Sequence, residues 1–540
     1  MLSQAISFDR DKVLPAAVLI LGLSAIWVVL TVVYRLYFHP LSHLPGPLLA
    51  KVTDLYGGYH AWTRRNHYHL FELHKKYGPV IRYGPDRVSF NSSVAVKEIY
   101  GASKPLKKAA GYRAVQLQKD TNNLFSSTDK GFHGKRRRIL GQGFSEQAMK
   151  SYEDIVHERV DKFCEILTKE AGGDGWGATK NMSKLCAGLT FDVMGALVFG
   201  QPFRILEDES GLSYVIDAII SAARSVGVFV HLPMIGKNEF LFRIRAILRL
   251  MFLSLKDIKN IKSFLTLSSE MTKERADKEA AKAAGEDMTK ANGTPNKDIL
   301  GYILNAKDPE TQEGLNLDEV WGEARLLIIA GSDTTSTSLA GALYYLARNP
   351  KIFERLRNEL RCAFPSEGDI WPGQKLSKCN YLRFVIDEAL RMACPVGGIL
   401  WRETMTDYMV EGIKLPKGTD VGVPLYAIHH NTNYFTDPHT FNPDRWDEKV
   451  VGEEFVALGK SAWLPFQIGS RGCIGRPLAN MELTLTLAKV VYSFDMKFDE
   501  GKESLGQTTL SDGILEFETR DQLTAETTGP FLRFKRAGRA

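Results

Sequence analysis

The sequence predicts a mainly helical protein with a small β region (class α+β), folded as one large unit behind an N-terminal membrane span. Helical patterns dominate the 540 residues, and the longest runs over residues 316–350. Short β-branched stretches lie around 80–90 and in the hairpin-like segment 407–424. Beyond residue 45 there is no long low-complexity linker and no repeat with a period of roughly 20–50 residues, which excludes solenoids and propellers.

The composition is that of a globular protein with a sizeable core. Hydrophobic residues make up 44% and charged residues 24% of the chain, and the net charge is +6. Such a mild basic excess suits an acidic partner or a membrane surface and does not indicate a nucleic-acid-binding protein. The six cysteines form no C-x-x-C pair, which argues against zinc ribbons and thioredoxin-like motifs and favours mostly buried, reduced thiols.

Residues 13–34 carry no charged side chain and are long enough to cross a hydrocarbon core of ~30 Å as a helix. A cleaved signal peptide is the alternative, but its apolar region should span only ~7–15 residues and end at a small-residue cleavage site. Basic residues follow the span at positions 35, 51, 64 and 65, so the positive-inside rule puts the bulk of the chain in the cytosol. We therefore predict a lumenal tail at 1–12 and a single transmembrane helix at 13–34.

Prolines punctuate the next stretch, at positions 40, 45 and 47. Because proline ends helices and favours extended backbone, residues 35–47 are predicted to form a stiff strap. The strap leads into a single folded domain over residues 48–540.

The helix predicted at 316–350 has a clear start signal, since Asn316 can cap it and Glu319 completes a capping box. Its apolar middle contains the polar stretch AGSDTT, which includes Asp333 and Thr334. A buried carboxylate is costly to desolvate, so a polar patch facing water is the alternative. The apolar run just before the stretch favours side chains that face the interior.

The stretch FQIGSRGCIG holds Cys473 between glycines and shortly before a helix-like segment. Backbone N–H groups and the helix dipole at a helix N-terminus lower the pKa of a thiol and stabilise the thiolate. The glycines at 469, 472 and 475 allow a flat, bulky group to approach the backbone, and Arg471 can meet negative charge on its edge. These features suggest that the loop binds iron protoporphyrin. The alternative is that Cys473 is a catalytic nucleophile, but no neighbouring histidine pattern provides the general base that would activate it.

Two further signals are weak by themselves. Glu388 and Arg391 lie three residues apart, so they share a helix face and can pair, as such residues do on many surface helices. Arg445 stands between a proline turn and a tryptophan in FNPDRW. These residues become informative only together with the motifs at 330–335 and 466–475.

Together the four motifs resemble those of the cytochrome P-450 superfamily of haem-thiolate monooxygenases, over essentially the whole chain. The family's oxygen-helix pattern, A/G-G-x-D/E-T-T/S, is met by residues 330–335. Its E-x-x-R pair is met by Glu388 and Arg391, with Arg445 as the third member of a structural charge cluster. Its haem loop, F-x-x-G-x-R-x-C-x-G, is matched at every fixed position, by Phe466, Gly469, Arg471, Cys473 and Gly475.

The resemblance implies a cytochrome P-450 fold and a role for each of these residues. Cys473 would be the axial ligand of the iron of haem b, and its thiolate favours O–O cleavage. Asp333 and Thr334 would deliver protons to the bound oxygen, with a helix kink at Gly331 making room for O2. The other cofactor-binding residues of the loop would be Phe466, Arg471 and Gly475.

One segment departs from the family pattern. Many members carry W-x-x-x-R on an early helix to hold a haem propionate, whereas this chain has His133 and Arg137 at those two positions. Imidazole can still donate a hydrogen bond to a carboxylate, so both residues are predicted to bind the cofactor. Arg402 falls where the family often has another arginine that contacts a propionate.

The resemblance also implies partners and a location. The chain has no G-x-G-x-x-G fingerprint, so NADPH-derived electrons would come from a separate NADPH–cytochrome reductase or a cytochrome b-type donor. The basic run 135–138 would form the docking face. The substrate would be a lipophilic small molecule reached from the membrane, and no nucleic acid is expected. The predicted location is the endoplasmic reticulum membrane, with the catalytic domain facing the cytosol.

The predicted function is insertion of one oxygen atom from O2 into such a molecule in a fungal secondary-metabolite pathway, because the chain looks most like enzymes of filamentous-fungal specialised metabolism. The alternatives on the same fold are an oxidase that couples phenols, closes rings or oxidises in several steps, and an O2-independent isomerase. Isomerases commonly lack the acid–threonine pair, so SDTT favours oxygen activation. A non-enzymatic haem carrier or sensor is a further alternative, which NADPH-dependent turnover would exclude.

Overall fold

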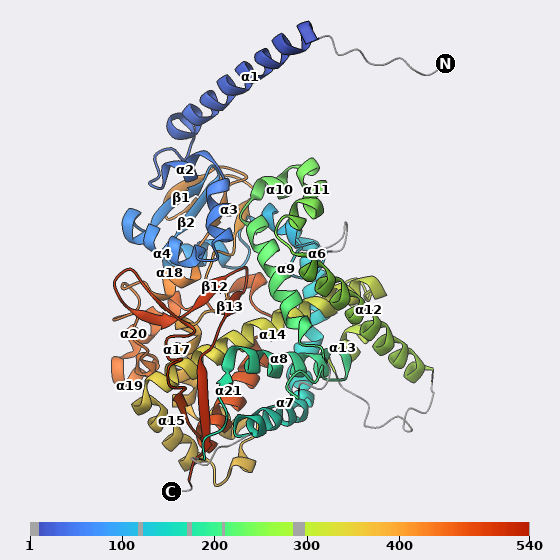
Figure 1. The fold of residues 1–540 in the computed structure, drawn as a ribbon, viewed down its shortest axis with the longest axis vertical. Helices are drawn as coiled ribbons and strands as arrows, with labels where there is room; N and C mark the ends of the chain where they lie inside the picture. The colour runs from blue at the N-terminus through green and yellow to red at the C-terminus, as the bar shows by residue number, and fades with distance from the viewer. Residues whose placement is uncertain (1–9, 117–121, 170–174, 208–210, 285–297, 539–540) are drawn as a thin grey trace.

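This computed structural model describes residues 10–116, 122–169, 175–207, 211–284 and 298–538 (Figure 1). Within these residues the protein is mainly helical with a small β region, which confirms the predicted fold class. Helix α1 (Arg10–Val33) projects away from one end of the body, into which the other elements pack (Figure 1). Residues 1–9 of the predicted lumenal tail lie outside the described residues.

Helices follow one another through the middle of the body, and the strands, most of them short, lie mainly before and after them. Its α-helices are α2 (Leu48–Val52), α3 (Leu55–Trp62), α4 (Asn66–Tyr77), α5 (Ser93–Tyr100), α6 (Lys130–Gly141), α7 (Glu146–Leu167), α8 (Met182–Phe199), α9 (Tyr214–Val230), α10 (Pro233–Lys237), α11 (Glu239–Leu250), α12 (Leu255–Ala283), α13 (Ile299–Asn305), α14 (Leu317–Arg348), α15 (Pro350–Ala363), α16 (Gln374–Ser377), α17 (Asn380–Met392), α18 (Leu425–His429), α19 (Glu448–Val451), α20 (Glu453–Ala462) and α21 (Arg476–Ser493). Short 3-10 turns are η2 (Ala110–Val115), η3 (Gln142–Phe144), η5 (Glu367–Asp369), η6 (Pro443–Trp446) and η7 (Gly469–Arg471). The strands are β1 (Val80–Gly84), β2 (Arg87–Phe90), β3 (Leu106–Lys108), β4 (Lys180–Asn181), β5 (Arg402–Thr404), β6 (Tyr408–Val410), β7 (Ile413–Leu415), β8 (Asp420–Gly422), β9 (Phe494–Phe498), β10 (Gln507–Thr509), β11 (Leu515–Phe517), β12 (Thr519–Asp521), β13 (Ala525–Thr527) and β14 (Phe531–Arg536).

The apolar N-terminal helix continues further than the sequence suggests. α1 passes directly into a π-helical turn (Tyr34–Phe38), and an 18-residue stretch within Leu14–Phe38 has a mean hydropathy of 2.7 with none of it buried. Such a helix is compatible with a membrane anchor. The helical backbone ends at His39, because the following proline disfavours helical geometry there. The predicted strap at 35–47 therefore begins as helix.

The start of the strap is fastened to the body. The guanidinium of Arg35 donates to the Val52 carbonyl at 2.5 Å, and the Arg35 carbonyl accepts from the buried Arg82 on β1 at 2.7 Å. The Arg82 N–H in turn donates to the Pro45 carbonyl at 2.7 Å. Both ends of the strap are thus held against the first strand.

The core is built around α14, which crosses the body, with α8 packed along it (Figure 1). The two helices approach closely, since Thr190 donates to the Ser332 carbonyl at 2.9 Å. A Cβ atom at Gly331 would lie 2.5 Å from the sulfur of Met194 on α8. The space on this side of Gly331 is therefore filled by Met194, and α14 runs without interruption through this position. The kink expected at Gly331 stays a prediction.

The largest sheet has the strand order β1-β2-β8-β5-β3 and lies beside α2, α3 and α4 (Figure 1). β6 and β7 form the antiparallel hairpin expected within 407–424, with Tyr408 opposite Leu415. β3 and β5 pair antiparallel so that Lys108 lies directly opposite Arg402. Like charges directly opposite each other on neighbouring strands are destabilising. A negative charge placed beside this pair would reduce the repulsion between Lys108 and Arg402.

Glu388 on α17 lies at the centre of a buried ion cluster. Arg391 donates two hydrogen bonds to its carboxylate, both at 2.9 Å, and Arg445 donates a third at 2.9 Å. The Asn442 backbone and the Trp446 indole donate at 2.9 and 3.1 Å. Burial raises the pKa of Glu388, but Arg391 and Arg445 together lower it by more, so the net shift is downward. The carboxylate therefore stays ionised.

The cluster also joins α17 to the segment that follows α18, because Arg391 donates to the carbonyls of His429 at 2.8 Å and Pro438 at 2.7 Å. The pKa of Glu388 is lower in the folded protein than its ordinary value of 4.5. The ionised carboxylate therefore stabilises the fold fully at pH values above 4.5. That contribution is lost as the pH falls through the lower folded value.

Glu388→Gln should lower the stability by ~3–5 kcal/mol, because it leaves the buried charge of Arg391 without its partner. The matched control is Glu274→Gln, which removes an exposed carboxylate that pairs with Lys278 at 2.7 Å and should cost less than ~1 kcal/mol. The measurements are the urea midpoint and the yield of folded protein. Equal midpoints for the two variants would show that the cluster does not support the fold.

Candidate haem site

The loop that carries Cys473 is held by its own backbone and by α5. The Cys473 N–H donates to the Phe466 carbonyl at 2.8 Å, which closes the loop. Gly469 has φ +73°, and a Cβ atom there would lie 2.1 Å from the Tyr100 carbonyl oxygen at the end of α5. Glycine alone meets both conditions. The ring of Phe466 packs edge-on against Trp463, with ring centroids 6.3 Å apart.

Cys473 lies just before α21. The residue is exposed, and the backbone N–H groups of Gly475 and Arg476 donate to its sulfur. Burial raises the pKa of the thiol, while these N–H groups and the charge of Arg137 lower it, and the net shift is upward. The N–H groups at the helix terminus lower this pKa as the sequence predicts, but desolvation outweighs them. A metal cation at the sulfur would reverse the balance, since metals deprotonate the thiols that bind them.

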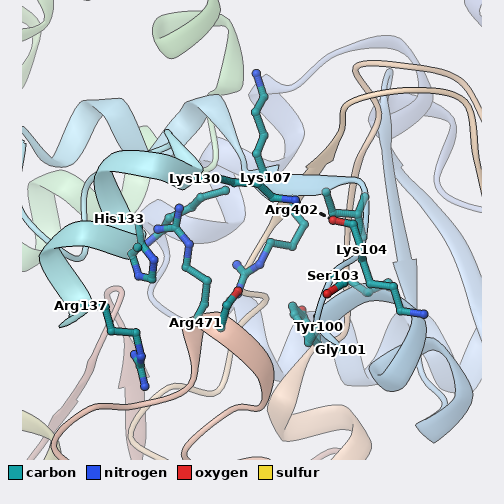
Figure 2. Close-up of a pocket in the computed structure, with 15 residues that line it drawn as sticks. Tyr100, Gly101, Ser103, Lys104, Lys107, Lys130, His133, Arg137, Arg402 and Arg471 are labelled. Carbon is teal, nitrogen blue, oxygen red and sulfur yellow. Dashed lines mark hydrogen bonds between the residues drawn. The ribbon is translucent and has the colours of Figure 1, made fainter. Parts of the chain in front are cut away.

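A cavity of about 310 Å³ beside this loop is lined by positively charged side chains (Figure 2). Figure 2 shows Arg402 and Arg471 converging on it from β5 and from the Cys473 loop. No acidic side chain lines the cavity in the described part of the chain. Its basic residues are Lys104, Lys107, Lys108, Lys130, His133, Arg137, Arg402 and Arg471.

Burial and mutual repulsion lower the pKa values of these groups. Burial, followed by the charges of Arg471 and Arg402, lowers the pKa of Lys108 well below its usual value. Burial, followed by Arg471 and Arg137, lowers the pKa of His133 to about 3, so its imidazole is neutral. Burial, followed by Arg402, lowers the pKa of Arg471 to about 10. The cavity therefore favours a ligand that brings negative charge, as the two propionates of haem do.

The predicted propionate residues differ in where they point. Arg137 donates to the Gly472 carbonyl at 2.6 Å, and in Figure 2 it points away from Arg402 and Arg471. Its role in this structure is to brace the Cys473 loop. The buried ring of His133 makes no hydrogen bond to any other described residue, so its N–H is free to donate to a ligand.

Lys108 is a candidate cofactor contact that the sequence did not reveal. Its ammonium donates to the Phe125 carbonyl and lies 3.4 Å from the centre of the Phe125 ring and 4.1 Å from that of Tyr112. It also lies directly opposite Arg402. No motif marks it, because its position beside Arg402 depends on the register of two strands that are far apart in sequence.

The basic run 135–138 is largely neutralised. Since Arg137 is engaged with the Cys473 loop, the run does not present four free positive charges to a partner. The run therefore carries less free charge than the sequence suggests, and its role as the docking face stays a prediction. Its acidic partners lie far along the chain and could not be recognised from the run itself. Three of its side chains are in ion pairs, namely Lys135 with Glu313, Arg136 with Glu319, and Arg138 with Asp308.

The two predicted catalytic residues lie on different faces of α14. Ala330 is exposed and Thr334 half-buried although α14 runs through the core, so these positions border an interior opening. The Thr334 hydroxyl donates to the Ala330 carbonyl at 2.8 Å. Its oxygen keeps acceptor lone pairs for a partner in the opening.

Asp333 lines a second cavity, of about 690 Å³, between α8, α9 and β13. Burial raises the pKa of Asp333 to about 6, while a hydrogen bond from Thr524 lowers it and the charge of Glu526 raises it. Glu526 borders the same cavity and pairs with Arg64 at 2.8 Å. A carboxyl with a pKa near 6 can take up and release protons near neutral pH, which suits a proton relay.

These features fit a haem. The sulfur of the exposed Cys473 offers an iron ligand, the opening at Thr334 offers space on α14, and the unpaired cations offer donors to carboxylates. α14 packs against α21, the helix that follows Cys473, so these parts belong to one region of the fold.

Comparison with known proteins agrees with this site. A family model described as Cytochrome P-450 matches residues 49–524. The chain is 36% identical over 531 residues to Cytochrome P-450 monooxygenase poxM of Penicillium oxalicum, with 97% of this chain and 95% of the relative covered. It is 35% identical over 537 residues to Cytochrome P-450 monooxygenase AKT7 of Alternaria alternata, with 96% and 97% covered. The protein therefore belongs to the cytochrome P-450 family.

Membership of this family confirms the class predicted from the motifs. The protein is an oxidoreductase of the monooxygenase type that uses haem b, with O2 and NADPH-derived electrons as co-substrates. Members of the family generally receive electrons from a redox partner and act on lipophilic substrates.

The reduced carbon monoxide complex of the haem-loaded protein should show the red-shifted absorption band after which the family is named, and Cys473→Ala should abolish it. The physical reason is that only a thiolate ligand donates enough electron density to the iron. Cys362→Ala, the same change at another exposed cysteine, is the control and should leave the band unchanged. Retention of the band in Cys473→Ala would exclude this residue as the ligand.

Lys108→Met should weaken haem retention and yet stabilise the haem-free protein, because it removes a buried charge that Arg402 and Arg471 repel. A hydrogen bond to a charged group is worth about 1.5–3 kcal/mol, so haem loss should be roughly 10–100-fold faster. Lys107→Met removes a charge that Glu403 already pairs at 3.1 Å and should change neither property.

For Lys108→Met and Lys107→Met, the rate of haem loss is measured as haem transfer to excess apomyoglobin. The stability of the haem-free protein is measured as its thermal midpoint. If Lys108→Met held haem as tightly as the Lys107→Met control, Lys108 would not be a cofactor contact.

Proposed function

We propose that this protein is a membrane-anchored haem-thiolate monooxygenase that inserts one oxygen atom from O2 into a lipophilic small molecule of a fungal secondary-metabolite pathway. The observation that carries the proposal is the exposed Cys473 beside a cavity whose buried cations Lys108 and Arg402 have no carboxylate partner among the described residues. Relatives of similar length from Penicillium oxalicum and Alternaria alternata support the fungal setting.

The protein's own residues position the cofactor. In this proposal Cys473 binds the iron, Phe466 and Gly475 shape the loop around the sulfur, and Arg137 braces that loop from α6. The bound haem supplies the activation of O2, while the protein places the substrate and controls access of water and protons. The donors to the propionates are Arg471, Arg402, His133 and Lys108.

Asp333 and Thr334 carry protons from solvent to the interior opening. Asp333 faces the cavity of about 690 Å³ and exchanges protons with water there, because its pKa of about 6 is close to neutral pH. Thr334 presents its hydroxyl to the opening on the other face. Adjacent positions on a helix point about 100° apart, so a rotation of the Asp333 side chain or a bridging water connects the two faces.

The proposed setting is the endoplasmic reticulum membrane. α1 with its π-helical extension would be the single span, and the catalytic domain over 48–540 would face the cytosol, where it meets NADPH–cytochrome reductase or a cytochrome b-type donor. The exposed apolar segment Leu14–Phe38 and the basic residues that follow it support this orientation. The paired charges of 135–138 do not favour that run as the docking surface.

The substrate is found most directly by comparing the metabolites of the host with and without this gene. The compound that accumulates without the gene is the substrate, and the compound that disappears is the product. The proposal expects the product to carry one more oxygen atom than the substrate. A product with an unchanged number of oxygen atoms would favour coupling, ring closure or isomerisation.

With that substrate, Thr334→Val should retain haem and consume NADPH but release more hydrogen peroxide per product. The reason is that a positioned proton donor contributes ~10²–10⁴-fold in rate, and valine keeps the shape without the hydroxyl. Asp333→Asn should slow turnover with less peroxide release, because it interrupts proton supply without opening the site at Thr334. The readouts are NADPH consumed, peroxide released and product formed.

The control is Thr335→Val, at a buried neighbouring position, which should couple NADPH to product like the unchanged protein. Unchanged coupling in both Thr334→Val and Asp333→Asn would remove this pair from the mechanism. A product yield that does not depend on NADPH and O2 would identify an isomerase.

A further inference from the structure

Three potential metal ligands meet at a point that is separate from the Cys473 loop. Ligand atoms of His430, His439 and Glu516 all lie within 4.8 Å of one another. His430 directly follows α18, His439 lies in the loop before η6, and Glu516 is on β11. Segments that are distant along the chain therefore converge on one cluster.

His430 contributes a lone pair that has no partner. Its Nδ1 lies 2.9 Å from the Tyr426 carbonyl, and because a carbonyl only accepts, Nδ1 carries the proton of the neutral ring. Its Nε2 is buried, makes no hydrogen bond within the described residues and faces Glu516 Oε1 at 3.5 Å. The residue is only 1% exposed, so water does not reach this nitrogen freely. Two buried acceptor atoms facing each other are unfavourable unless a cation lies between them.

The hydrogen bond from Nδ1 fixes the tautomer of this ring and leaves Nε2 as a buried acceptor without a partner. A histidine nitrogen with a free lone pair is the form that binds metals.

The other two ligands are oriented by outer contacts. The Tyr426 hydroxyl donates to Glu516 Oε2 at 2.6 Å, which leaves Oε1 directed at the two imidazoles. His439 Nδ1 lies 2.6 Å from that same oxygen. The rings of His430 and His439 stack at 4.9 Å, and the ring of Phe71 lies edge-on to both. Such outer partners fix the orientation of metal ligands and limit access of water.

We propose that His430, His439 and Glu516 bind a Zn²⁺ ion, with the remaining coordination position taken by water. Two imidazoles and one carboxylate suit zinc, whereas Mg²⁺ and Ca²⁺ prefer all-oxygen ligand sets. Metal–ligand bonds of ~2.0–2.1 Å in a tetrahedral site place the ligand atoms about 3.3–3.4 Å apart. The 3.5 Å between His430 and Glu516 already has this spacing, and the 2.6 Å between His439 and Glu516 would widen as zinc replaces the shared proton.

Zinc at this site would hold the same two points of the chain that Arg391 holds. Arg391 donates to the carbonyls of His429 and Pro438, which directly precede the two histidine ligands. The metal would therefore brace the Glu388–Arg391 cluster from its far side and tie it to β11. Its expected role is stabilisation of the fold, without contact with the haem iron.

The first test measures zinc directly. The haem-loaded full-length protein is stripped with a chelator, dialysed at low micromolar free zinc and analysed for zinc and iron. We expect about one zinc per haem iron, and in His439→Gln or Glu516→Gln a zinc affinity lower by about a hundredfold or more, since loss of even an outer partner costs about 10–100-fold. His43→Gln, at an exposed histidine outside the cluster, is the control and should bind zinc like the unchanged protein. Absence of zinc from the unchanged protein, or equal zinc in all variants, would overturn the proposal.

The second test measures stability. Zinc should raise the thermal midpoint of the unchanged protein and of His43→Gln, and should not raise that of His439→Gln. Ca²⁺ and Mg²⁺ should have no such effect in any of them. Haem content should be the same in all samples and shows that each variant is folded. His439 is only partly buried, so its substitution should disturb folding little. If Glu516→Gln folds poorly, His439→Gln therefore decides the test. A zinc-induced shift that persists in His439→Gln would place the metal elsewhere.

Discussion

The ion pair between Glu388 and Arg391 supports the part of the molecule on which the haem loop rests. Arg391 fixes the carbonyl of His429, and the ring of His429 in turn accepts from the Leu464 N–H at 2.9 Å. The indole of Trp463 donates to a backbone carbonyl of α17 at 3.0 Å. The chain that leads into the Cys473 loop is thus held by α17 and α18. A buried charge pair on α17 therefore helps to hold the chain that leads to Cys473.

The haem site combines this rigid support with an unfavourable charge distribution. Lys108, Arg402 and Arg471 lie close together without a carboxylate, and each has its pKa lowered by burial. Such an arrangement destabilises the chain by itself and is relieved by a dianionic ligand, so cofactor binding and folding are coupled. Asp333 opens to a different cavity from the one these cations line, so the proposed proton supply would be separate from them.

Much of the fold and the identity of the site could be predicted from the sequence. The capping box of Asn316 and Glu319 and the β6–β7 hairpin both form as the local patterns indicate. Each depends on residues only a few positions apart, whose preferences are readable along the chain. The ends of helices and strands were less predictable. The anchor helix continues through Arg35, because the Arg35 guanidinium donates to the Val52 carbonyl of the body, a contact that the sequence does not reveal.

The class of protein and its cofactor follow from the sequence, because the four motifs consist of fixed residue types at short spacings. The environment of the motif residues follows from tertiary packing: desolvation raises the pKa of Cys473 against the effect of its neighbouring N–H groups. The same holds for every contact between distant segments, since burial and strand register follow from the packing of the whole chain. Such contacts are Lys108 opposite Arg402, Met194 beside Gly331, the acidic partners of 135–138, and His430 meeting His439 and Glu516.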